Sequence, residues 1–209
     1  MSSFVIRYFD LQARAEIVKA ILTFVGADWK VEHPVWPEEK ANQPSGTLPV
    51  MIETKPDGTQ FVLSDAAAIE FYLLKKYNII GQESNEQEAR QLQLRNQVLD
   101  ACFLGWMYQF GSEEIRTYAK DNFAVLAKMV VEYHEKILKE NGSNGHYFGD
   151  KVGYADIAIY AGFGALKAID GIKETALELF SEENAPLINK VFKAVENEPK
   201  LAKYVASCK

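Results

Sequence analysis

The stretch that decides the fold is FVIRYFDLQARAEIVKAILTFVG, at residues 4–26. Residues 4–9 are apolar, β-branched and aromatic, which predicts a buried strand. From residue 14 to residue 25 the apolar side chains recur at helical spacing, and Gly26 follows as a helix-ending glycine. A strand that turns directly into an amphipathic helix is the opening unit of an α/β domain.

The residues that follow extend this unit. Apolar and β-branched runs predict strands at 28–32, 48–53 and 60–63, and helical spacing predicts a helix at 65–77. Lys55-Pro56-Asp57-Gly58 has strong turn chemistry and joins the last two strands in a hairpin. Strand, helix, strand, hairpin and helix together make an α/β sandwich of about eighty residues, which suits a small domain.

The chain changes character at Asn78. The polar stretch 78–86 reads as a linker, and the residues after it read as helical. Helices are predicted at 87–110, 114–139, 154–169, near Leu177, and at 186–195. We therefore expect two domains, an α/β domain at 1–78 and an all-helical domain at 87–209.

The bulk composition narrows the class of protein. The 209 residues are 48% hydrophobic and 25% charged, with a net charge of -6, as in an ordinary globular domain without an electrostatic affinity for nucleic acid or anionic membranes. The N-terminal residues do not resemble a secretory signal, and no apolar run is long enough to span a bilayer.

The two cysteines, Cys102 and Cys208, do not form a Cys-x-x-Cys motif, so a zinc ribbon and a dithiol centre are not expected. This cysteine usage fits a reducing, cytoplasmic compartment.

Several motifs together resemble a known family. Residues 8–16, Tyr-Phe-Asp-Leu-Gln-Ala-Arg-Ala-Glu, resemble the first strand-to-helix turn of tyrosine-type glutathione transferases, especially the sigma class, whose usual form is Tyr-Phe-x-x-Arg-Gly-Arg-Ala-Glu. The resemblance continues in order through Trp36-Pro37-Glu38-Glu39-Lys40, Gly46-Thr47-Leu48-Pro49, Ala68-Ile69 with Tyr72-Leu73, and residues 149–156.

This resemblance implies a fold and an activity. The N-terminal domain would be thioredoxin-like and bind glutathione as co-substrate, and the all-helical domain would contribute a pocket for the electrophile. The family conjugates glutathione to small hydrophobic electrophiles, is cytoplasmic and homodimeric, and needs no metal. No nucleic acid or membrane partner is expected.

The resemblance assigns the catalytic role to Tyr8, with Arg14 as electrostatic support. A free thiol has a pKa of about 8.5, so little thiolate exists at neutral pH, and a hydrogen bond from a hydroxyl to the thiolate favours the charged form. Without the motif, Tyr8 reads as a core aromatic, and Arg14 reads as a surface arginine near Glu16. The motif favours catalysis for Tyr8 and leaves both interpretations open for Arg14.

The resemblance also implies residues for two parts of glutathione. The indole N–H of Trp36 and the ammonium of Lys40 would hold the glycine carboxylate; the alternative is a loop cover with a solvated lysine. A cis bond before Pro49 would present the backbone of Leu48 to the cysteinyl part as an added strand, whereas the plainer interpretation is a strand-opening proline. The spacing of each motif favours the binding role.

The sequence departs from the family at the γ-glutamyl end. The usual Gln-Ser or Glu-Ser is Asp65-Ala66 here, so a serine hydroxyl is missing. The Ala66 N–H still attracts an anion at a helix N-terminus, and Asp65 could accept from the γ-glutamyl ammonium. The loss of one hydrogen bond to a charged group, about 1.5–3 kcal/mol, predicts weaker glutathione binding. Thr47 in place of the frequent glutamine, and Gln12-Ala13 in place of Arg-Gly, are further departures, and together these changes argue against strong activity.

The remaining implied residues are more ambiguous. Asp100 matches an acid that reaches the γ-glutamyl amine across a dimer interface, and it is equally a solvated helix carboxylate. Candidates for lining the electrophile pocket are Phe9, Leu11, Phe103, Trp106, Met107, Phe110 and Tyr204. An aromatic stripe at helical spacing is more often core. Residues 153–156 resemble the family's capping box, which is a folding device.

Two functions remain open. The first is an enzyme that activates the glutathione thiol through Tyr8. The second is a glutathione transferase fold used as a binding or structural protein, which Thr47, Asp65 and Ala66 favour. A thioredoxin-like redox protein is disfavoured by the missing cysteine, and a serine- or cysteine-type transferase is disfavoured because Tyr8 fits the motif directly.

Overall fold

The computed structural model describes residues 1–80 and 84–208. It divides into two compact units, Met1–Ile80 and Gly81–Lys209, and each is described by itself. The linker predicted at 78–86 includes residues 81–83, which lie outside the described residues.

The first unit is an α/β unit with a four-stranded sheet in the order β2-β1-β3-β4. Its elements are β1 Ser3–Arg7, α1 Glu16–Phe24, β2 Asp28–Glu32, the short 3-10 helix η1 Lys40–Asn42, β3 Val50–Thr54, β4 Gln60–Ser64 and α2 Ala66–Lys76. Strand β1 pairs parallel with β2 and antiparallel with β3, and β3 pairs antiparallel with β4. The predicted hairpin is confirmed: Gly58 has a φ of 83°, and its N–H donates to the Lys55 carbonyl at 2.9 Å.

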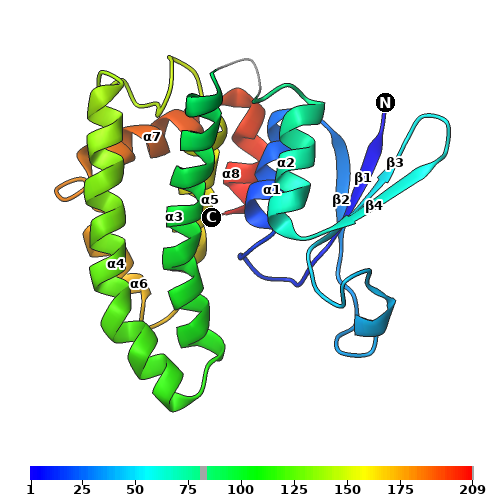
Figure 1. Cartoon of the computed structure of the whole chain (residues 1–209), viewed down its shortest axis with the longest axis horizontal. Helices are drawn as coiled ribbons and strands as arrows, with labels where there is room; N and C mark the ends of the chain where they lie inside the picture. Colours follow the sequence, from blue (N-terminus) through cyan, green and yellow to red (C-terminus); the bar gives the residue numbers. More distant parts are fainter. Residues whose placement is uncertain (81–83, 209) are drawn as a thin grey trace. The chain divides into compact units, whose positions relative to one another are not determined.

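The core of this unit follows from alternation in the strands and helical spacing in α1. Phe4 and Ile6 are buried on one face of β1, and Ile17, Ile21 and Leu22 are buried on α1. Helices α1 and α2 pack against each other (Figure 1). Burial of large apolar side chains, at about 25 cal/mol per Å² of apolar surface, is the main favourable term that holds this layer together.

Among the predicted strand boundaries, two shifts affect the site. The first strand was expected to reach Phe9 but ends at Arg7, so Tyr8 and Phe9 lie just beyond its end. The strand expected from Leu48 begins at Val50, after a proline that has no N–H for the ladder. Both changes place predicted site residues in the loops at the ends of strands.

Among the described residues of the second unit, all regular secondary structure is helical. Its elements are α3 Asn85–Phe110, α4 Glu113–Glu140, α5 Tyr154–Lys167, α6 Lys173–Leu179, α7 Pro186–Asn197, η2 Pro199–Leu201 and α8 Ala202–Ser207. Helices α3 and α4 are long neighbours (Figure 1), and each begins at a serine cap: Ser84 accepts from the Gln87 N–H at 3.3 Å, and Ser112 from the Ile115 N–H at 3.5 Å. Helix α8 was not predicted from the sequence.

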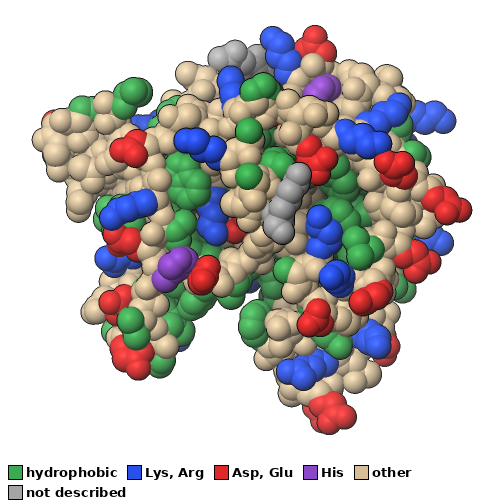
Figure 2. Space-filling model, turned by 180° about the vertical axis from the view of Figure 1, so that it is seen from behind, with side chains coloured by type: hydrophobic (Ala, Val, Ile, Leu, Met, Phe, Trp, Pro, Cys, Tyr) green, Lys and Arg blue, Asp and Glu red, His purple; other side chains and the backbone are tan. Residues whose placement is uncertain are grey.

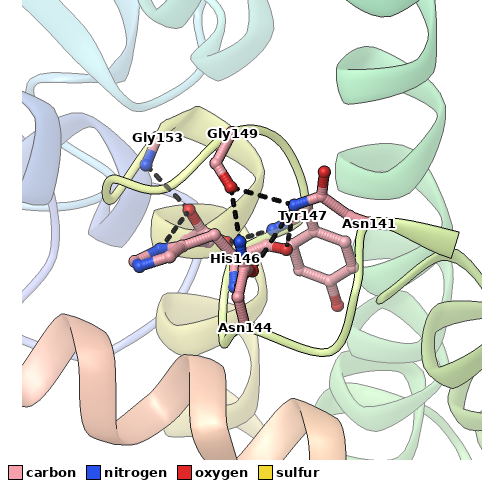
Figure 3. A network of polar contacts seen from close by, with 7 residues as sticks. Asn141, Asn144, His146, Tyr147, Gly149 and Gly153 are labelled. Atoms are coloured by element: carbon pink, nitrogen blue, oxygen red, sulfur yellow. Dashed lines mark hydrogen bonds and ion pairs between the residues drawn. The ribbon is translucent and has the colours of Figure 1, made fainter. Parts of the chain in front are cut away.

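The segment between α4 and α5 is held by a polar network (Figure 3). The Asp156 carboxylate accepts from the Gly153 N–H at 2.8 Å and from the Tyr147 N–H at 2.9 Å. The first bond is the predicted return from the third helical position to the cap, so this capping interaction is confirmed. The Asn141 side chain adds bonds to the carbonyls of His146 and Gly149, which fixes the loop onto the C-terminus of α4.

Charged side chains of both signs are interspersed over the face that Figure 2 shows. This pattern agrees with the modest net charge of -6. Within the described ranges, none of the helices is long and apolar enough to cross a membrane. The predicted fold class, an α/β part followed by an all-helical part, is confirmed.

Candidate functional site

The sheet brings the ends of all its strands together at one edge. The last register pairs join Arg7 of β1 to Glu32 of β2 and to Val50 of β3, and Val50 to Ser64 of β4. Residues immediately beyond these pairs therefore share that edge, and they are Tyr8, His33, Pro49 and Asp65. Three of these four residues are site residues predicted from the sequence.

Tyr8 is buried, and its hydroxyl has a defined partner. Only 4% of the residue is exposed, and the backbone N–H of Arg14 donates to the Tyr8 hydroxyl oxygen at 3.0 Å. Burial raises the pKa of Tyr8 above 10.0, while the bond from Arg14 and the Arg14 charge oppose that rise. The hydroxyl is therefore protonated at neutral pH. Its oxygen accepts from the Arg14 N–H, and a hydroxyl also carries one hydrogen that it can donate.

Arg14 contacts Tyr8 through its backbone. It lies in the loop before α1, which begins at Glu16 and not at Arg14 as the helical spacing predicted. Because the residue is outside the helix, its N–H is not used in the helical ladder and can reach back to Tyr8. The predicted electrostatic role of the guanidinium stays a prediction.

An aromatic chain links Tyr8 to Trp36 and Lys40. The Phe9 ring lies 5.5 Å from the Tyr8 ring and 5.4 Å, edge to face, from the Trp36 ring. The Lys40 ammonium lies 5.9 Å from the centre of the Trp36 ring, within range of a cation–π attraction. The segment coils between these two residues, since the Lys40 N–H donates to the Pro37 carbonyl at 3.0 Å. The structure therefore places Trp36 and Lys40 together, and Phe9 between Trp36 and Tyr8.

The bond between Leu48 and Pro49 is cis, as predicted. Pro49 is buried and Leu48 is half-buried. The bond between Trp36 and Pro37 is also cis, which the sequence analysis did not predict. Gly46, three residues before Pro49, has a φ of 62°, a conformation that glycine adopts without strain.

Asp65 caps helix α2. Its backbone has a φ of 80°, in the left-handed range, and its Oδ1 accepts from the Ala68 N–H at 3.0 Å. Ala66, 7% exposed, is the first residue of the helix. An anion at this end would meet the helix N-terminus but also the Asp65 carboxylate, which agrees with the expected weakening at the γ-glutamyl end.

The residues predicted for the electrophile pocket have different environments. Phe103 and Phe110 of α3 are exposed, as is Leu11 of the first unit, while Trp106 and Met107 are half-buried. Tyr204 of α8 is buried, with its ring 6.5 Å from that of Tyr160. Asp100 is exposed on α3. The pocket and the role of Asp100 stay predictions.

His33 is the residue that the sequence analysis missed. Its Nδ1 lies 2.9 Å from the carbonyl oxygen of Tyr8. A signal in the sequence was present, because Pro34, two residues after the end of β2, has no backbone N–H to donate to the strand beside it.

No group of three or more His, Cys, Asp or Glu side chains that could hold a metal ion occurs at 1–80 or 84–208. Cys102 is buried, its thiol donates to the Gly162 carbonyl at 3.4 Å, and burial raises its pKa to about 12. A thiol in that state is inert.

With this geometry in view, comparison with known proteins identifies the family. Residues 84–208 match the family described as "Glutathione S-transferase, C-terminal domain". The chain belongs to the glutathione S-transferase family.

Individual relatives agree in length and fold. The chain is 28% identical over 208 residues to "Probable glutathione S-transferase 6" of Caenorhabditis elegans, with 96% of this chain and 94% of the relative covered. The solved sigma-class glutathione S-transferase of Fasciola hepatica has a TM-score of 0.82 at 18% identity, with 100% and 97% of the two chains covered. A monomeric glutathione S-transferase of Necator americanus has a TM-score of 0.76 at 22% identity, with 98% and 97% covered. The two structures show that the whole chain has the two-part transferase fold.

Proposed function

We propose that this chain conjugates glutathione to small hydrophobic electrophiles, with Tyr8 as the catalytic residue that stabilises the glutathione thiolate. The observation that carries the proposal is the hydrogen bond from the Arg14 N–H to the Tyr8 hydroxyl oxygen at 3.0 Å. It fixes the oxygen and leaves the hydroxyl hydrogen as the donor. Membership of the glutathione S-transferase family supports this activity, and so does the relative whose name is "Probable glutathione S-transferase 6".

The reaction needs only a thiol, a hydrogen-bond donor and an electrophile. The glutathione thiol releases its proton to solvent, and the Tyr8 hydroxyl donates a hydrogen bond to the sulfur anion, which lowers the pKa of the thiol. The thiolate then attacks an electrophilic carbon. A carbon–sulfur bond forms, and the leaving group departs with the electron pair of the bond that breaks. Because burial raises the pKa of Tyr8, the hydroxyl keeps its proton throughout.

The proposed glutathione-binding residues lie in the first unit, outside its strands. Trp36 and Lys40 hold the glycine carboxylate, the Leu48 backbone pairs with the cysteinyl part beside the cis Pro49, and the Ala66 N–H receives the γ-glutamyl carboxylate. Asp65 accepts from the γ-glutamyl ammonium with the carboxylate oxygen that does not cap α2. The N-terminal unit is then the glutathione domain, and the helical unit supplies the electrophile pocket.

The cytoplasmic location and the homodimer belong to this proposal as well. Both rest on the family, and in the homodimer Asp100 of one copy reaches the γ-glutamyl amine bound to the other. A sedimentation or light-scattering measurement of mass tests the dimer directly, since a monomeric relative has been solved.

The test is conjugation of glutathione to a chloronitrobenzene by the wild type, Tyr8→Phe and Tyr118→Phe, with glutathione affinity measured by calorimetry. Tyr118 is exposed on α4, so its variant is the matched control for loss of a tyrosine hydroxyl. The proposal expects turnover to fall only in Tyr8→Phe, with binding retained. Equal activity in all three proteins would remove Tyr8 from the mechanism.

A second candidate function is glutathione binding without efficient catalysis. The observation in its favour is the capping bond from the Ala68 N–H to Asp65, which engages the shorter Asp65 carboxylate with α2, and no serine follows as it does in the family. Calorimetric binding of glutathione by the wild type, with no turnover of several electrophiles, would select this function.

A further inference from the structure

The last residue of β2 and the residue after it hold the two polar groups of the Tyr8 main chain. Its N–H donates to the Glu32 carbonyl at 3.0 Å, and its carbonyl oxygen lies 2.9 Å from His33 Nδ1. A carbonyl oxygen only accepts hydrogen bonds, so His33 Nδ1 carries the hydrogen and donates it. Glu32 and His33 therefore hold both main-chain polar groups of Tyr8, its N–H and its carbonyl.

The His33 side chain replaces a backbone donor that the sequence removes. In a parallel ladder, a residue that donates to position 32 accepts from the N–H of position 34. Position 34 is proline, which has no N–H. Without His33, the Tyr8 carbonyl would lose its partner at the point where β1 ends and the loop to α1 begins.

We propose that His33 is a positioning residue for Tyr8, acting through the Tyr8 carbonyl. The proposal rests on the proposed function of Tyr8. The Arg14 N–H holds the hydroxyl end of the side chain, and Glu32 and His33 hold the main-chain end. A displacement of about 1 Å in a reacting group can lower a rate by about 100-fold, so fixing both ends matters for donation to a sulfur atom.

The first test is His33→Ala. Turnover should fall about tenfold, while KM for glutathione changes less than about twofold, because the binding residues stay in place. His33→Asn should restore most of the turnover, since its Nδ2 lies the same number of bonds from the backbone as the histidine Nδ1. His33 is exposed, so neither variant opens a cavity.

A double-variant cycle separates positioning from a general structural effect. If His33 affects turnover only by positioning the Tyr8 hydroxyl, His33→Ala causes no further loss of turnover in a Tyr8→Phe background. Full additivity of the two losses would overturn the proposal. Pro34→Ala offers a second route, because it returns a backbone N–H at position 34, and in the His33→Ala background it should recover part of the lost turnover.

A measurement without turnover keeps this inference apart from the proposed function. In nuclear magnetic resonance spectra of tyrosine-labelled protein, the Tyr8 signal is identified by its disappearance in Tyr8→Phe. It should shift in His33→Ala and return toward its wild-type position in His33→Asn, while the other tyrosine signals stay unchanged and report a folded chain. An unmoved Tyr8 signal would overturn the role of His33. A moved signal in a protein without transferase activity would instead overturn the proposed function.

Discussion

Tyr8 and Tyr147 are both buried, with 4% and 1% of each residue exposed, but their hydroxyl groups have different partners. The Tyr8 hydroxyl accepts from a backbone N–H at 3.0 Å, at the sheet edge where three strands end and one begins. The Tyr147 hydroxyl meets His134 Nδ1 at 2.6 Å inside the helical unit, where His134 is itself completely buried. Burial alone therefore does not mark a functional tyrosine.

The surroundings of Tyr147 show what a structural tyrosine looks like in this chain. Its N–H donates to Asp156, and its ring stands edge-on to His134 with the ring centres 5.3 Å apart (Figure 3 shows the Tyr147 loop). Its hydroxyl is engaged with the imidazole, whereas the Tyr8 hydroxyl oxygen accepts from the backbone N–H of Arg14. The following predictions test whether the two tyrosines have separate roles in catalysis and stability.

The largest effect is expected for Tyr8→Phe on catalysis. Removal of one oriented donor to a developing or stabilised anion costs about 100-fold to 1,000-fold in turnover. The free energy of unfolding should change little, because only one bond at a loop is lost. Steady-state conjugation rates and a urea titration on the same preparation check both parts. A variant that unfolds earlier and turns over normally would assign Tyr8 to stability.

Tyr147→Phe should show the reverse pattern. It leaves the buried His134 Nδ1 without its partner, and an unsatisfied buried polar group costs about 1–3 kcal/mol of unfolding free energy. Turnover of the folded fraction should equal that of the wild type. Urea unfolding followed by circular dichroism measures the loss, and Tyr118→Phe, exposed on α4, is the control. A large loss of turnover in fully folded protein would contradict the separation of roles.

Acid should weaken the helical unit through His134. Burial lowers the pKa of His134 from 6.5 to about 3, so its stabilising contribution is complete above pH 6.5 and is lost as the pH falls toward 3. Between pH 7 and pH 5, the wild type should lose about 2 kcal/mol more unfolding free energy than His134→Gln.

His146 acts with the opposite sign. The Asp156 carboxylate raises its pKa above 6.5, so its contribution is complete below that value and is lost as the pH rises through the raised value. This term is common to the wild type and His134→Gln, so it cancels in their difference. Parallel pH profiles for the two proteins would show that His134 does not control the acid sensitivity.

The smallest effect is expected at the γ-glutamyl end of the site. Ala66→Ser adds a hydroxyl at the first position of α2 and should tighten glutathione binding about tenfold, from one added hydrogen bond to a charged group. Ala67→Ser, at the exposed neighbouring position, is the matched control and should leave affinity unchanged. Calorimetry measures both. Equal affinity in all three proteins would place the carboxylate away from the Ala66 N–H.

Sequence reasoning succeeded where the signal is local. The helical spacing of residues 17–25 predicted α1, and the turn chemistry of Lys55-Pro56-Asp57-Gly58 predicted the hairpin. Both depend on neighbours within a few residues, where backbone preferences and periodic burial act directly. The cis bond before Pro49 was predicted from the resemblance to the family at residues 46–49. Boundaries were less accurate: α1 begins at Glu16 and not Arg14, because a loop at residues 8–15 separates it from β1.

The amino-acid sequence by itself determined the two-part architecture, and its resemblance to the family pointed to Tyr8 as the catalytic candidate and to the pairing of Trp36 with Lys40. The tertiary structure decided how those residues are held. His33 reaches the carbonyl of Tyr8 across 25 positions of sequence, and Asp65 uses its carboxylate to cap α2. The first contact depends on the register of β2 beside β1, and the second on a left-handed backbone at Asp65. Register and backbone conformation at such points are set when the whole sheet packs, so local sequence patterns do not reveal them.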